Sequence, residues 1–123
     1  MPHARQKTGG LGEAAARSYL EERGYVVLAQ NWHAGRWGEI DIVAQEGNEL
    51  IFVEVKTRRG AGFGYPEEAV NRAKQAKLRG AAQAYLTAHP HLPQQPRFDV
   101  VAIVLSERGE VEDIKHFRCL TFS

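Results

Sequence analysis

The spacing of hydrophobic residues changes along the chain and predicts an alternation of helices and strands. Between residues 9 and 23, apolar side chains recur with a helical period, and Gly24 is suited to end that helix. Shorter apolar runs further along predict strands. The expected elements in chain order are a helix at 9–23, strands at 25–31, 40–44 and 50–55, a helix at 66–88, and strands at 100–105 and 111–118.

The run at residues 100–105 is apolar throughout, which is typical of a strand buried on both faces. The helix before it, with Pro66 at its first position, carries the chain across the sheet and favours parallel pairing of this strand. A chain of 123 residues suffices for one hydrophobic core, so we expect residues 1–123 to form a single domain. The predicted fold class is α/β, with a central mixed β-sheet flanked by helices.

The second and third strands are separated by Gly47 and Asn48, a dipeptide typical of two-residue hairpin turns. Counting outward from this turn places Asp41 directly across from Glu54. Side chains alternate along a strand, so both carboxylates project from the same face of the hairpin. The Cβ atoms of opposed residues lie only about 4.5–5.5 Å apart.

Two ionised carboxylates at about 5 Å repel by roughly 3 kcal/mol at an effective dielectric near 20. A bound cation removes this cost, and hard divalent ions such as Mg²⁺ suit an all-oxygen site. The same counting places Glu39 across from Lys56 on the same face of the hairpin. The alternative interpretation is a pair of surface carboxylates, with Glu39 and Lys56 forming a rim salt bridge worth under about 1 kcal/mol.

Both helices bring charged side chains toward these strands. Glu13 lies at the border of the apolar stripe of the first helix, where it either faces the sheet or complements the dipole at the helix N-terminus. Lys74 and Lys77 fall within the apolar face of the second helix rather than opposite it. We therefore expect their ammonium groups to reach toward the acidic residues of the hairpin.

Charge is segregated along the chain, although the net charge is only +1. Every charged residue from 38 to 55 is acidic, whereas basic residues predominate from 56 to 79. Ordinary solvated faces produce such runs too, but an acidic centre bordered by Arg58, Arg59 and the helix lysines suits a metal site that faces a polyanion. A loop at 32–37 adds Arg36 and two tryptophans, which either stack on bases or lie buried under the first helix.

Other classes of protein are disfavoured by the composition. Cys119 is the only cysteine, which excludes an internal disulfide and a cysteine-based zinc cluster. No stretch approaches the roughly 18 uninterrupted apolar residues of a membrane span, and the basic N-terminal residues are not followed by an apolar segment. We expect a cytoplasmic protein with no membrane partner. Asp99 is expected to be a turn residue, a partner of Arg97, or a support for the site.

These motifs in this order resemble a known superfamily. Glu13 in the first helix, Asp41 in the second strand and Glu54-Val55-Lys56 at the end of the third resemble the restriction-endonuclease-like PD-(D/E)xK superfamily, whose core is αβββαβ. The strings GLGEAAARSYL, GEIDIVA, FVEVKTR, AVNRAKQAKL and RFDVV look like the YraN family. Archaeal Holliday junction resolvases, which are homodimeric Mg²⁺-dependent endonucleases, are similar by pattern.

The resemblance implies a metal-dependent nuclease that hydrolyses phosphodiester bonds in DNA, with branched and other non-B-form DNA as candidate substrates. Asp41, Glu54 and the Val55 carbonyl would bind Mg²⁺ or Mn²⁺, and Glu13 would contribute directly or through water. Lys56 would orient or activate the attacking water.

The resemblance assigns Glu39 a supporting role, in which it fixes Lys56 or an outer water molecule. Ile40 stands where the superfamily has a proline before the aspartate, a departure that leaves the expected metal site intact. The resolvases also imply a homodimer. The alternative function is a non-catalytic nucleic-acid-binding or protein-interaction module built on a nuclease fold.

Overall fold

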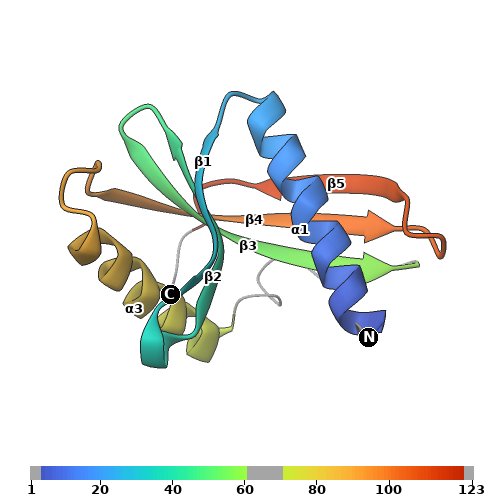
Figure 1. Ribbon diagram of the computed structural model, residues 1–123, viewed down its shortest axis with the longest axis horizontal. Coiled ribbons are helices and arrows are strands. Elements are labelled where there is room, and N and C mark those ends of the chain that lie inside the picture. The colour runs from blue at the N-terminus through green and yellow to red at the C-terminus, as the bar shows by residue number, and fades with distance from the viewer. Residues whose placement is uncertain (1–3, 61–70, 121–123) are drawn as a thin grey trace.

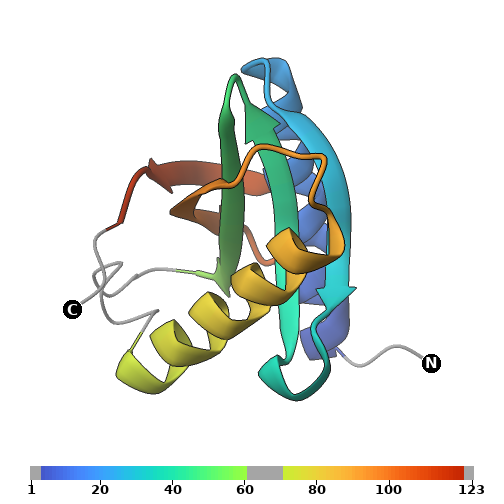
Figure 2. The ribbon, with the colours of Figure 1, turned by 90° about the vertical axis from the view of Figure 1, so that its left-hand side faces the viewer.

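The computed structural model describes residues 4–60 and 71–120 of the chain. Its elements are α1 (Ala4–Glu22), β1 (Val26–His33), the 3-10 helix η1 (Gly35–Trp37), β2 (Glu39–Glu46), β3 (Glu49–Arg59), α3 (Arg72–Ala88), β4 (Gln95–Leu105) and β5 (Val111–Phe117). Figures 1 and 2 show one sheet with α1 and α3 on its opposite faces.

The five strands follow chain order across the sheet, β1-β2-β3-β4-β5. β3 and β4 are parallel, because α3 carries the chain from the end of one to the start of the other, and the remaining neighbours are antiparallel. The predicted α/β fold with a mixed sheet is therefore confirmed. The arrangement is compatible with a restriction-endonuclease-like core.

Two hydrophobic layers hold the helices against the sheet. On one face, Ala16 and Leu20 of α1 pack with alternate residues of the strands, among them Ile42, Val53 and Val101. On the other face, Ala81 and Tyr85 of α3 pack with a second set that includes Val43, Leu50 and Phe52. This alternation assigns each strand residue to one helix or the other.

α1 begins at Ala4, before the start predicted at residue 9, and ends where predicted because Gly24 adopts a φ of +88°. The earlier start moves Glu13 away from the first turn of the helix, so the interpretation of Glu13 as a helix-dipole partner was wrong. Gly12 lets α1 approach β3 closely, since a methyl group there would overlap the side chain of Thr57.

β2 and β3 pair in the register predicted from the Gly47-Asn48 turn. Glu46 pairs with Glu49 beside the turn, and the ladder continues to the pair formed by Ile42 and Val53. The next residue outward on β2 is Asp41, which contacts β3 through its side chain. The end of the hairpin is therefore held together by a carboxylate.

β1 is longer than predicted, and the expected loop at 32–37 was partly wrong. Trp32 pairs with Ile40 of β2, so the strand continues to His33. The two tryptophans pack under α3 rather than under α1. Trp32 lies edge-on to Tyr85 with ring centroids 5.0 Å apart, and a methyl group at Gly80 would overlap the ring of Trp37.

α3 begins at Arg72, and Asn71 caps it by accepting a hydrogen bond from the backbone N–H of Lys74 at 2.9 Å. The extended backbone of Asn71, with ψ at 177°, rules out the single helix predicted over 66–88. Pro66 lies outside the described residues. Within the described ranges, no helix combines the length and apolarity that crossing a membrane requires.

Candidate metal and nucleic-acid site

Asp41 lies at the end of the β2–β3 ladder and is fixed there by the backbone of β3. Its Oδ2 atom accepts a hydrogen bond from the N–H of Val55 at 2.8 Å. This bond takes the place of a backbone ladder bond between the two strands. It orients the carboxylate toward Val55, the middle residue of the Glu54-Val55-Lys56 triplet. The sequence prediction that Asp41 and this triplet lie together is borne out in position.

Glu54 points to the face of the sheet that α3 covers and is largely buried, with 8% of its surface exposed. Its Oε1 atom forms an ion pair with the ammonium group of Lys74 from the first turn of α3. The prediction that Lys74 reaches toward the acidic residues is confirmed. Burial of an unpaired carboxylate would be costly, so Lys74 supplies the counter-charge beside Glu54.

The carboxylates of Glu13, Asp41 and Glu54, called here the carboxylate cluster, act on one another. Burial, the charge of Glu54 and, more weakly, the charge of Glu13 raise the pKa of Asp41 to about 7, against the opposing effects of the Val55 N–H and of Lys74. Glu13 is half-buried on α1 and thus contributes to the cluster from the other side of the sheet. Negative charge is concentrated here more strongly than the fold alone requires.

Lys56 is half-buried two residues after Glu54 and therefore lies on the same face of β3. Its side chain forms no hydrogen bond or ion pair with another residue of the ranges 4–60 and 71–120. The alternative interpretation, a salt bridge between Glu39 and Lys56, was wrong, because the pairing of β2 with β3 ends at Ile42 and Glu39 pairs with β1 alone. Glu39 instead places its Oε2 atom 3.4 Å from Nε2 of His33.

The basic residues predicted to contact nucleic acid differ in their surroundings. Arg58 and Lys77 are exposed and extend from β3 and α3, the elements that carry Glu54 and Lys74. Arg36 is exposed on η1 and stacks on Trp37, with 4.7 Å from Cζ to the ring centroid. Arg59 donates to the backbone carbonyl of Glu107 at 2.6 Å and thus has a structural contact as well.

The donor atoms of the carboxylate cluster fit Mg²⁺ or Mn²⁺ in kind, since all are carboxylate oxygens and their mutual repulsion favours a bound cation. Their arrangement is not that of a closed metal site. Over the described ranges, no group of three or more His, Cys, Asp or Glu side chains is placed to hold a metal ion, and Glu54 is engaged by Lys74. Lys74 occupies Oε1 of Glu54, so a metal ion bound by Glu54 would either share this carboxylate with Lys74 or replace it.

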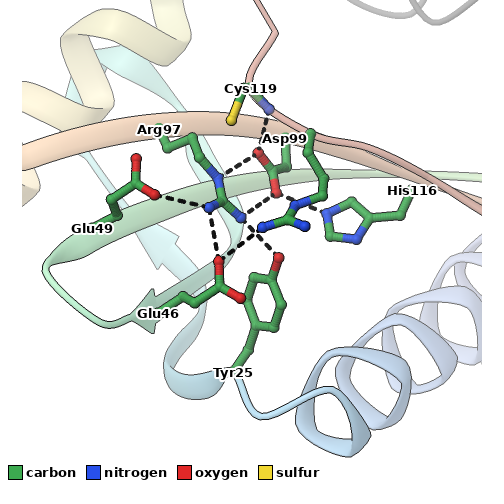
Figure 3. A network of polar contacts seen from close by, with 8 residues as sticks. Tyr25, Glu46, Glu49, Arg97, Asp99, His116 and Cys119 are labelled. Atoms are coloured by element: carbon green, nitrogen blue, oxygen red, sulfur yellow. Dashed lines mark hydrogen bonds and ion pairs between the residues drawn. The ribbon is translucent and has the colours of Figure 1, made fainter.

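A second charged cluster lies at the opposite end of the hairpin, beside the Gly47-Asn48 turn. Arg97 of β4 donates to both oxygens of Asp99 at 3.1 and 3.0 Å, and to Glu46, Glu49 and the hydroxyl group of Tyr25 (Figure 3). The remaining contacts come from the end of the chain: His116 and the backbone N–H of Cys119 contact Asp99, and Arg118 contacts Glu46. We call these eight residues the Arg97 network.

The Arg97 network ties four strands and the segment after β5 together. Burial opposes ionisation of Asp99, yet hydrogen bonds from His116, Arg97 and Cys119 outweigh it and lower the pKa of Asp99. Of this network the sequence indicated only the pairing of Arg97 with Asp99. Glu46 and Glu49 are a further signal in the sequence, because two acids facing each other across a turn need a cation from elsewhere in the chain.

Comparison with known proteins gives a consistent assignment. The model of the uncharacterised protein family UPF0102 matches residues 12–103. A UPF0102 protein of Syntrophotalea carbinolica is 45% identical over 117 residues, which cover 95% of this chain and 93% of the relative. Another, of Synechococcus sp., is 51% identical over 100 residues, covering 80% and 76% of the two chains.

The UPF0102 protein of Dictyoglomus thermophilum is 41% identical over 108 residues, which cover 88% of this chain and 91% of the relative. The matched range includes Glu13, Asp41, the Glu54-Val55-Lys56 triplet and Lys74. The chain therefore belongs to the UPF0102 family, the YraN-like group with a nuclease fold.

Proposed function

We propose that this protein is a metal-dependent nuclease that hydrolyses phosphodiester bonds in DNA. The observation that carries the proposal is the Asp41 carboxylate, which is fixed by the Val55 N–H next to the buried Glu54, with Glu13 near enough to act on its charge. Two carboxylates about 5 Å apart repel by roughly 3 kcal/mol at an effective dielectric of 20. Residues that repel each other in this way are retained more readily where a bound cation relieves the repulsion than where they serve packing alone.

In this proposal Asp41, Glu54 and the Val55 carbonyl hold Mg²⁺ or Mn²⁺, with Glu13 acting directly or through water. The cation would supply Lewis acidity at the scissile phosphate. The chain's own contribution is orientation. The hydrogen bond from the Val55 N–H holds the Asp41 carboxylate in place before any ligand binds, which reduces the ordering needed on binding.

In this proposal Lys56 acts on the attacking water. Its ammonium group shares a face of β3 with Glu54, and among the described residues no carboxylate neutralises it. A cation so placed can orient a water molecule and stabilise the negative charge that develops on the phosphate. Arg58, Lys77 and Arg36 are exposed and would contact neighbouring phosphates. In this proposal Glu39 supports an outer water molecule.

One observation favours a second candidate, a non-catalytic nucleic-acid-binding module. Lys74 already neutralises Glu54, and the described side chains do not form a closed metal site. A module of this kind would keep the basic residues for DNA binding and use the carboxylate cluster only to position α3. It gives no reason for the half-buried Lys56 beside Glu54, which is why we favour the nuclease.

The deciding experiment is cleavage of end-labelled four-way junction, flap, single-stranded and linear duplex DNA in the presence of Mg²⁺ or Mn²⁺. We expect cleavage of at least one branched substrate, and a loss of about 100-fold or more in Lys56→Ala. Lys115→Ala, which removes an exposed lysine of β5, is the matched control and should cleave normally. Binding of DNA without cleavage under every condition would support the second candidate instead.

The proposed substrate also bears on assembly and location. Cutting two strands of a junction calls for two sites, so we propose that the protein acts as a homodimer in the cytoplasm, where DNA is available. Light scattering of the purified protein with and without junction DNA measures whether it is a dimer. A monomer that cleaves both strands of one junction would contradict the dimer.

A further inference from the structure

Lys74 differs from the other basic residues near the carboxylate cluster because it is the one joined to it by an ion pair within the described residues. Its backbone N–H is fixed by the Asn71 cap at 2.9 Å, so the base of the side chain has a defined position at the start of α3. The two partners differ in exposure. The Lys74 side chain is 41% exposed, whereas that of Glu54 is only 10% exposed.

This asymmetry determines which partner can leave. A half-exposed lysine on a flexible stem can turn its ammonium group into water, where it is well solvated. Glu54 is held on a central strand and cannot follow. The carboxylate therefore keeps its place on the strand, whereas the cation beside it can be exchanged.

We propose that Lys74 is an exchangeable counter-cation, which neutralises Glu54 until a divalent cation takes over and then turns outward to contact the phosphate backbone. This rests on the proposed function, because it uses the same metal site. It makes Lys74 a positioning residue with two successive partners. Lys74 and the divalent cation compete for Glu54, so metal affinity is limited by the ion pair.

A purely structural ion pair predicts a different outcome. If Lys74 only anchored α3 to the sheet, its loss would loosen the site and weaken both folding and metal binding. If it competes with the metal, its loss destabilises the metal-free protein but strengthens metal binding. The two roles therefore move metal affinity in opposite directions.

The test uses Lys74→Met, which keeps the length of the side chain and removes its charge. Calorimetric titration with Mn²⁺ should show about tenfold tighter binding than in the wild-type protein. The melting temperature of the metal-free variant should lie several degrees below that of the wild type. This difference in melting temperature should shrink at saturating Mn²⁺, because the metal stabilises the folded state. Lys77→Met removes the same charge three residues further along α3 and should leave both quantities near their wild-type values.

Lys74→Arg covers the case in which Lys74→Met fails to fold. Its guanidinium group keeps the ion pair and can hold the carboxylate through two hydrogen bonds, so Mn²⁺ should bind severalfold more weakly than to the wild type. Unchanged Mn²⁺ affinity in Lys74→Arg, or unchanged or weaker affinity in Lys74→Met, would overturn the inference. In that event, binding that still depended on Asp41 and Glu54 would leave the proposed metal site standing, whereas a wild-type protein that bound neither Mn²⁺ nor Mg²⁺ would overturn both.

Discussion

Asp99 shows how a single buried carboxylate can stabilise the whole sheet. Its side chain is fully buried and receives hydrogen bonds from Arg97, His116 and the backbone of Cys119. Asp99→Asn should lower the free energy of unfolding at pH 7 by about 3 kcal/mol, because it leaves the Arg97 guanidinium with one charged partner fewer in a buried place. Urea denaturation measures this loss. Asp113→Asn, on the exposed face of β5, is the control and should change stability by less than about 0.5 kcal/mol.

The same carboxylate sets a dependence on pH. The pKa of Asp99 is lower in the folded protein than in the unfolded chain, where it is near 3.9. Its contribution is therefore complete above about pH 4 and is lost as the pH falls through the folded value. The difference in unfolding free energy between the wild type and Asp99→Asn should be constant from pH 7 to about pH 5 and should shrink below pH 4. A difference that grew on acidification would contradict this assignment.

The carboxylate of Asp41, unlike that of Asp99, should destabilise the metal-free protein when it is ionised. Ionisation of Asp41 is opposed by its burial and by the charges of Glu54 and Glu13. Asp41→Asn keeps an oxygen that can accept the Val55 N–H but removes one negative charge, so it should stabilise the metal-free protein at pH 8 by about 1–3 kcal/mol. The same substitution should abolish thermal stabilisation by Mn²⁺. A variant less stable than the wild type in chelator would show that the cluster carries no repulsive cost.

Residue positions near the hairpin could be predicted because the turn fixes the register, and the register fixes which residues face each other. Lys74 could be predicted because a lysine on the apolar face of a helix has to find a polar partner. The Arg97 network could not, since its members come from segments that meet only in three dimensions. Glu39 was misplaced because the pairing of β2 with β3 ends at Ile42, where the prediction assumed that it would continue, while the pairing of β2 with β1 runs on to Glu39.

At the scale of the elements, the contact of α1 with β3 depends on a glycine. A Cβ atom at Gly12 would overlap the side chain of Thr57, next to Lys56 on β3, whereas a Cβ atom at Gly10 would meet nothing within 4 Å. Gly12→Ala should destabilise the protein by about 1–3 kcal/mol through overpacking, and Gly10→Ala should stabilise it by up to about 1 kcal/mol through helix propensity. Thermal unfolding of the two variants measures both effects, and equal changes would argue against a close contact.

The ends of helices were the least predictable features of the elements. α1 extends to Ala4 although two adjacent glycines, at residues 9 and 10, favoured a later start. For α3, the sequence predicted a helix start at Pro66 and gave no weight to Asn71. The structure shows that Asn71 caps the described helix. The strands and their order were predictable, because apolar runs bounded by turns leave few arrangements for a sheet of this size.

For the molecule as a whole, the two charged clusters lie at opposite ends of the β2–β3 hairpin and have opposite requirements. The Arg97 network, at the turn, satisfies its charges internally. The carboxylate cluster lies at the other end of β2, about 17 Å away by strand rise, and has one described basic partner for three acids. The end of the hairpin at the turn is thus held rigidly by the Arg97 network, and it supports the carboxylate cluster, whose remaining negative charge can be balanced by ligands.

The exposed basic residues around the carboxylate cluster are expected to contact DNA phosphates. Each phosphate contact lowers the slope of log affinity against log salt by about 0.9 for duplex DNA. Arg58→Ala and Lys77→Ala should therefore each reduce the magnitude of this slope by about 1, and the double variant by about 2, in fluorescence anisotropy titrations with chelator present to prevent cleavage. Lys115→Ala removes an exposed charge from β5, the strand at the edge of the sheet, and should leave the slope unchanged. If Lys115→Ala reduced the slope as much as Arg58→Ala did, the DNA would be bound by net charge alone. The surface around Glu54 would then not be the binding site.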